Sequence, residues 1–95
     1  MKQRGKGAMS TEAAEAIAAR ALLFLAEDDR RLVRFLGETG LDPATLKSRM
    51  GTPELLASVL GYLLGDESQL LVFAASAGLD PLDIGKAHQA LETSK

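Results

Sequence analysis

The tetrapeptide Gly-Leu-Asp-Pro occurs twice in the sequence, at residues 40–43 and again at residues 78–81. Each of its residues suits a corner between two helices. Glycine adopts the left-handed conformation that ends a helix, aspartate caps the free amides of the next helix, and proline fits that helix's first position. The leucine is then placed to hold the corner against the core. The motif therefore predicts the same helix–corner–helix connection at two places in the chain.

The tetrapeptide belongs to a longer internal repeat. When residues 21–49 are placed over residues 59–87, nine of the 29 positions are identical. The identities are leucines at helical spacing, one phenylalanine, one capping aspartate and the corner itself. We therefore expect an all-α fold, a compact bundle of about six helices. It would form from two three-helix units, about residues 11–50 and 53–92, with pseudo-two-fold symmetry.

Capping residues predict where the six helices begin and end. Ser, Thr or Asp before a helix accepts hydrogen bonds from its first amides, and glycine ends it. Gln69 is placed to complete a capping box with Asp66. No strand is expected, because alternating apolar patterns are absent. The expected helices run from Ser10 or Thr11 to near Glu27, from Asp28 to Gly37 or Gly40, from Asp42 to Gly51, from Thr52 to Gly65, from Asp66 to Gly78, and from Asp80 onward.

The fifth expected helix contains the stretch 70–75, which is apolar on every side. A helix of this kind is either central to the fold or covered by a partner. Its counterpart in the first unit, residues 28–40, carries three arginines. We therefore expect the fifth helix to be the buried one and the second helix to lie at the surface.

Length and composition indicate one small soluble domain. The chain has 95 residues, is 46% hydrophobic, contains 4% aromatic residues and has no cysteine. Leucine and alanine must therefore fill the core, and no apolar run is long enough to span a membrane. Residues 1–9 are polar and basic, so we expect a disordered tail before a single domain over residues 10–95. The start lacks the apolar segment of a signal peptide, which favours the cytoplasm; Met9 is an alternative translation start.

The net charge of −2 is unevenly distributed. The first seven residues carry +3, whereas residues 50–95 carry two lysines and six carboxylates, which gives −4. A body of this charge repels a phosphate backbone. The sequence therefore argues against nucleic acid as the partner.

No group of residues suggests a catalytic, cofactor or metal site. His88 is the only histidine, and a metal site needs three or four ligands. The serines have no base at a recognisable spacing. The acidic pairs at 28–29 and 66–67 are explained as helix caps and first-turn charges. We therefore expect a protein that is not an enzyme and that holds no cofactor.

Arg30, Arg31 and Arg34 form the candidate partner-binding site. Residues 30 and 34 share a helical face, and the second unit replaces all three arginines, so the fold does not require them. These side chains could dock an acidic partner. The alternative is a solvated face held by local ion pairs with Glu27 and Glu38.

Two stretches, ALLFLAEDDRRLVRFLGETGLDPATLKSR and LLASVLGYLLGDESQLLVFAASAGLDP, give the chain a resemblance to a known family. Over about residues 12–91 it resembles a family of short alphaproteobacterial proteins, the domain of unknown function 3572. The combination of an FLA-D element, L-x-RFL and TGLDP carries this resemblance. It implies a helical fold, and it implies no reaction, cofactor or substrate.

These observations favour a non-enzymatic helical module that binds another protein, with a second copy of the chain as one candidate partner. Two alternatives stay open at this point. One is a nucleic-acid-binding helical protein, which the acidic body opposes, and the other is a sensor that holds a small ligand between its helices.

Overall fold

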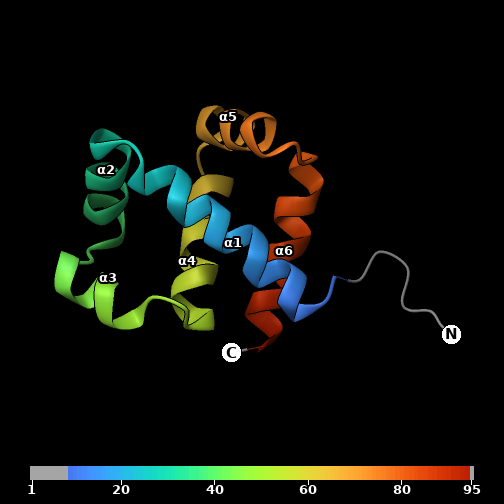
Figure 1. The fold of residues 1–95 in the computed structure, drawn as a ribbon, viewed down its shortest axis with the longest axis horizontal. Coiled ribbons are helices and arrows are strands. Elements are labelled where there is room, and N and C mark those ends of the chain that lie inside the picture. The colour runs from blue at the N-terminus through green and yellow to red at the C-terminus, as the bar shows by residue number, and fades with distance from the viewer. Residues whose placement is uncertain (1–8, 95) are drawn as a thin grey trace, which may run out of the picture.

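The computed structural model describes residues 9–94. In this part of the chain there are six helices and no strand, as the sequence predicts (Figure 1). The predicted tail lies outside the described residues except for Met9, which packs against the core. The helices are α1 (Thr11–Ala26), α2 (Asp29–Thr39), α3 (Pro43–Arg49), α4 (Pro53–Leu64), α5 (Glu67–Ala77) and α6 (Pro81–Ser94).

The predicted caps form at the starts of these helices. The side chains of Ser10, Asp28, Asp42 and Thr52 accept hydrogen bonds from amides of the helix that follows, at 3.0, 2.9, 2.7 and 3.2 Å. Each bond satisfies a donor that has no partner within its own helix. The helix starts are therefore fixed by local chemistry that can be read from the sequence.

The glycines of the two Gly-Leu-Asp-Pro corners adopt the same backbone conformation. Gly40 ends α2 with φ of 76°, and Gly78 ends α5 with φ of 69°. Both lie in the left-handed region, where a side chain would be strained. Of the two glycines considered for the end of α2, Gly40 is the one that ends it.

Three helices form the centre of the fold. α6 packs along both α1 and α4, and α1 also packs on α4; Figure 1 shows α1 passing in front of α4 and beside α6. Gly61 permits the close approach of α6 to α4, because a Cβ there would lie 3.3 Å from Nε2 of His88. The buried residues of α4 are Leu55, Leu56, Ala57, Val59, Leu60 and Leu63.

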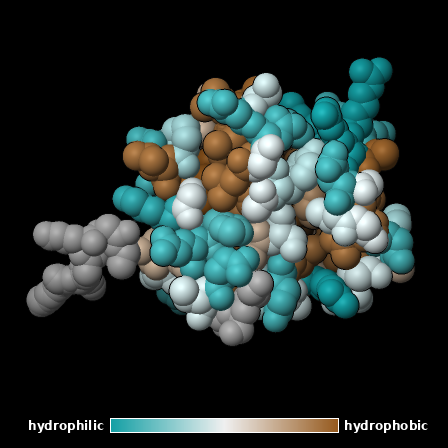
Figure 2. Space-filling view, turned by 180° about the vertical axis from the view of Figure 1, so that it is seen from behind, coloured by the Kyte–Doolittle hydropathy of each residue, from teal (hydrophilic) through white to brown (hydrophobic). Residues whose placement is uncertain are grey.

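The prediction that the fifth helix is the buried one is wrong. α5 buries only Phe73 and Ala74, while Leu71 and Val72 are 49% and 51% exposed. α4 is central instead, because it packs on both α1 and α6. On the face opposite α1, hydrophobic residues gather around α5 and the adjoining end of α6 (Figure 2). The prediction that α2 lies at the surface is confirmed, since Phe35 is its one buried residue.

The third helices of the two units differ. α3 has seven residues and buries none of them, whereas α6 has 14 residues and packs on two core helices. The expected pseudo-two-fold symmetry is therefore not shown by the described helices, although both corners contain a glycine in the left-handed region.

None of the helices within residues 9–94 has both the length and the hydropathy to cross a membrane. α4 and α5 have the required length and hydropathy only when they are taken together, and this pair is bent by 111° at the break between the two helices.

Candidate functional site

The structure does not bring the three candidate arginines into one patch. Arg31 turns back onto α1: its guanidinium carbon lies 3.9 Å from the centre of the Phe24 ring, and its Nη1 donates to the Phe24 carbonyl oxygen at 3.2 Å. This cation–π contact fastens α2 to α1. Arg30 is exposed, and Arg34 lines a cleft beside α4. Docking through all three arginines stays a prediction.

The alternative of local ion pairs is not seen either. Within residues 9–94, no ion pair joins Arg30, Arg31 or Arg34 to an acidic side chain. Arg31 instead bonds a backbone oxygen. The charge of Arg34 acts at longer range, where it contributes to the lowered pKa of Asp66.

Arg34 belongs to an open polar cleft of about 480 Å³ between α2 and α4. Its lining includes small residues of α4 and side chains of both signs of charge. Tyr62, which lines the cleft, packs edge-on against Phe35, with ring centres 5.3 Å apart. The lining residues are Arg34, Glu38, Thr39, Ser58, Gly61, Tyr62, Gly65 and Asp66.

Hydrogen bonds fix the end of this cleft. The Nε2 of Gln69 donates to the hydroxyl of Tyr62 at 2.8 Å and to a carboxylate oxygen of Asp66 at 3.0 Å. The backbone N–H of Gln69 donates to the other carboxylate oxygen at 3.2 Å. The side-chain and backbone hydrogen bonds from Gln69 lower the pKa of Asp66 below its ordinary value of 3.8, because they favour the ionised carboxylate.

We expect Asp66→Asn to reduce the acid sensitivity of the fold. The pKa of Asp66 is lower in the folded chain than 3.8, so its contribution is complete above that pH and is lost as the pH falls through the folded value. The variant should be less stable than the parent at neutral pH. It should also lose less stability between about pH 5 and about pH 2.5, as measured by urea unfolding.

Glu67→Gln is the matched control for this experiment, because it removes the adjacent carboxylate without touching the hydrogen bonds from Gln69. It should keep the acid sensitivity that comes from Asp66. If Asp66→Asn and the parent lose stability equally on acidification, the pKa of Asp66 is not lowered by folding.

A second, apolar surface lies along the exposed side of α1. We call it the α1 groove. It has a volume of about 440 Å³ and runs between α1 and the connection from α3 to α4. Two of its large apolar side chains, Leu23 and Met50, are 62% and 54% exposed. The residues that line the α1 groove are Glu15, Ala19, Leu22, Leu23, Ala26, Met50, Gly51 and Leu56.

A smaller hollow of about 180 Å³ follows the other flank of α1, where α1 meets α5. Leu23 borders this hollow as well as the α1 groove, so it forms a ridge between them. Arg20 and Glu27 lie on this flank, and the Nη2 of Arg20 donates to the Ala77 carbonyl oxygen at 3.1 Å. The outer side of α1 is therefore an apolar ridge with one basic and one acidic residue along one edge.

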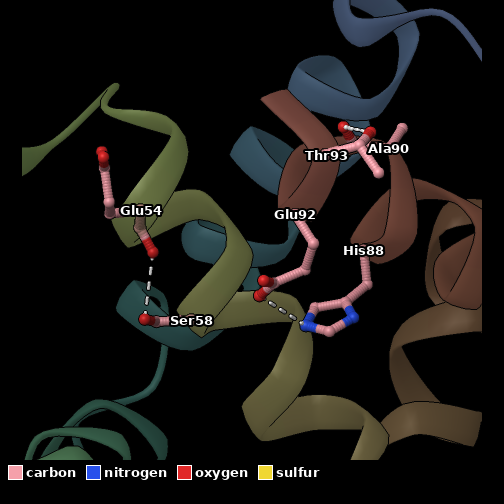
Figure 3. Close-up of polar contacts among 6 residues, drawn as sticks. All are labelled: Glu54, Ser58, His88, Ala90, Glu92 and Thr93. Carbon is pink, nitrogen blue, oxygen red and sulfur yellow. Dashed lines mark hydrogen bonds and ion pairs between the residues drawn. The ribbon is translucent and has the colours of Figure 1, made fainter. Parts of the chain in front are cut away.

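His88 and Ser58 do not form a catalytic pair (Figure 3). The Nε2 of His88 pairs with a carboxylate oxygen of Glu92 at 3.4 Å, within α6. The hydroxyl of Ser58 donates to the Glu54 carbonyl oxygen at 3.0 Å and is turned away from the imidazole. Among residues 9–94, no three His, Cys, Asp or Glu side chains gather in a way that could hold a metal ion.

The model of one protein family matches this chain over residues 11–94, which span all six helices. Its description reads "Protein of unknown function (DUF3572)". The chain belongs to the DUF3572 family. This confirms the resemblance that the sequence motifs indicate. No curated protein and no solved structure matches this DUF3572 chain.

Sequence reasoning missed the α1 groove of this DUF3572 chain. Leu23 falls outside the inward stripe of α1, and Met50 is far from it along the chain, so no local pattern joins them. One signal was available: Ala16, Ala19, Leu23 and Ala26 recur at intervals of three and four, a second apolar stripe on the side of α1 away from the core.

Proposed function

We propose that this protein is a non-enzymatic helical module that binds another protein chain through the α1 groove. The observation that carries the proposal is the open apolar surface around Leu23, which is 62% exposed on the core helix α1. Apolar surface of this kind, rimmed by polar residues, is typical of interaction sites. The α1 groove follows a helix, so the partner that suits it is the apolar face of an amphipathic helix.

The surface of α5 supports a protein-binding role, although no residue of α5 lines the α1 groove. The sequence left two explanations for its apolar character, a central position or a covering partner, and α5 is not central. Its Leu71 and Val72 remain about half exposed, and Phe73 and Ser76 of the same helix border the hollow beside α1. α5 therefore also leaves apolar surface exposed.

A library of displayed helical peptides tests the proposal. Peptides selected on the parent protein should bind Leu23→Asp at least about tenfold more weakly, because a carboxylate at the centre of an apolar interface must be desolvated. Val33→Asp is the matched control, since Val33 is 67% exposed on α2 and does not line the α1 groove. Selected peptides that bind both variants equally would overturn the proposal. A selection that yields no binder would also overturn it if the chain is monomeric as well.

A further inference from the structure

We infer that the occupant of the outer side of α1 is a second copy of this chain, with the two α1 helices packed antiparallel about a two-fold axis at Leu23. This inference rests on the proposed function, and it names the partner. The exposed residues along this side of α1 are Ala16, Ala19, Leu23 and Ala26. Leu23 is the large side chain among them, so it has to be covered by whatever binds there.

The charges beside Leu23 favour a second copy over an unrelated helix. In an antiparallel pair with Leu23 opposite Leu23, Arg20 lies level with Ala26 of the second copy. Arg20 is therefore offset from Glu27 of the second copy by only one residue, which is about 1.5 Å along the helix axis. The two-fold axis repeats this contact, so each dimer has two such pairs.

The flanks of α1 agree with this arrangement. A two-fold axis perpendicular to both helices sets each flank of α1 against the same flank of the second copy. Arg20 and Glu27 share one flank, the hollow beside α5, so they meet each other across the interface. The α1 groove lies on the other flank. Its exposed Met50 would therefore be covered by the same contact.

Arg20 is already oriented for an ion pair with Glu27 of the second copy. Its guanidinium donates one hydrogen bond to the Ala77 carbonyl oxygen at 3.1 Å, which holds it on this flank and leaves further N–H groups free to donate. The backbone N–H of Glu27 caps the end of α1. Glu27 is exposed at the surface. A carboxylate and a guanidinium on one flank form a self-complementary edge, which a two-fold contact requires.

Sedimentation equilibrium from about 1 µM to about 500 µM tests the inference with the whole chain. The parent should form a dimer. Leu23→Asp should weaken it by about 30-fold or more, because it places two carboxylates at the two-fold axis. Val33→Asp, exposed on α2, should dimerise like the parent.

Charge exchange tests the register. Arg20→Glu and Glu27→Arg should each weaken the dimer by about tenfold, because each creates like-charged pairs. In a mixed dimer, the carboxylate introduced in the first variant faces the guanidinium introduced in the second. The unchanged Glu27 of the first variant likewise faces the unchanged Arg20 of the second. The mixture should therefore recover the affinity of the parent as a heterodimer. Thermal unfolding of each variant shows whether the substitution has disturbed the fold.

Two results would overturn the inference: a parent that stays monomeric at about 500 µM, or a mixture no tighter than its two components. Neither result would overturn the proposed function, because peptide binding to the α1 groove is measured separately. Conversely, a dimer that dissociates in Leu23→Asp, together with no selected peptide, would leave the second copy as the one partner of this surface.

Discussion

Phe35→Ala should destabilise the chain by about 3–5 kcal/mol, the range for a large buried aromatic side chain. Phe35 is fully buried and is the one buried residue of α2. Its ring meets Tyr62 edge-on, with the ring centres 5.3 Å apart. Without it, α2 would keep only partly buried leucines and Arg31 to hold it to the core. For a chain of 95 residues, whose total stability is about 5–14 kcal/mol, this loss is large.

Urea unfolding followed by circular dichroism at the helix band measures this loss. Val33→Ala is the control, because it truncates a side chain in the same helix that is 67% exposed. Its effect should stay within about 0.5 kcal/mol. Equal effects from the two substitutions would show that α2 is not anchored through Phe35.

Leu60→Ala should cost about 2–5 kcal/mol, because it opens a cavity at the centre of α4. Leu60 is fully buried where α4 packs against α1 and α6. Leu71→Ala makes the same truncation in α5, where the side chain is 49% exposed. We expect that substitution to cost less than about 1 kcal/mol, because about half of this residue's surface is already in contact with water.

The pair of leucine variants tests which helix is central. Thermal and urea unfolding should rank Leu60→Ala well below Leu71→Ala in stability. The reverse ranking would place α5 in the core, as its apolar sequence suggests, and would contradict the packing described above.

The ends of the helices could be predicted from the sequence because they depend on neighbours along the chain. Asp28, Asp42 and Thr52 accept their hydrogen bonds from amides only two or three residues away. The predicted capping box at Asp66 formed only in part. The backbone N–H of Gln69 donates to the Asp66 carboxylate as expected. The Gln69 side chain donates to the same carboxylate, whereas a capping box requires it to accept from the Asp66 backbone N–H. The backbone N–H of Asp66 instead donates to the Leu63 carbonyl oxygen.

The sequence could not show which of the two apolar helices, α4 or α5, lies at the centre of the fold. What distinguishes them is the fit between helices, such as the space beside Gly61 that admits the His88 ring of α6. Spacing correctly placed residues 30 and 34 on one helical face. It could not show that Arg31 would stack on Phe24, because that contact joins two helices. The α1 groove was missed for the same reason.

The weak attachment of α3 has a consequence for amide hydrogen exchange. α3 has seven residues, buries none of them, and packs on α4. Segments with so few buried contacts open locally at a lower free energy than the core. Met50 and Gly51, which follow α3 directly, form one wall of the α1 groove. Each local opening of α3 would therefore also move that wall, so a partner bound in the α1 groove should slow amide exchange in α3.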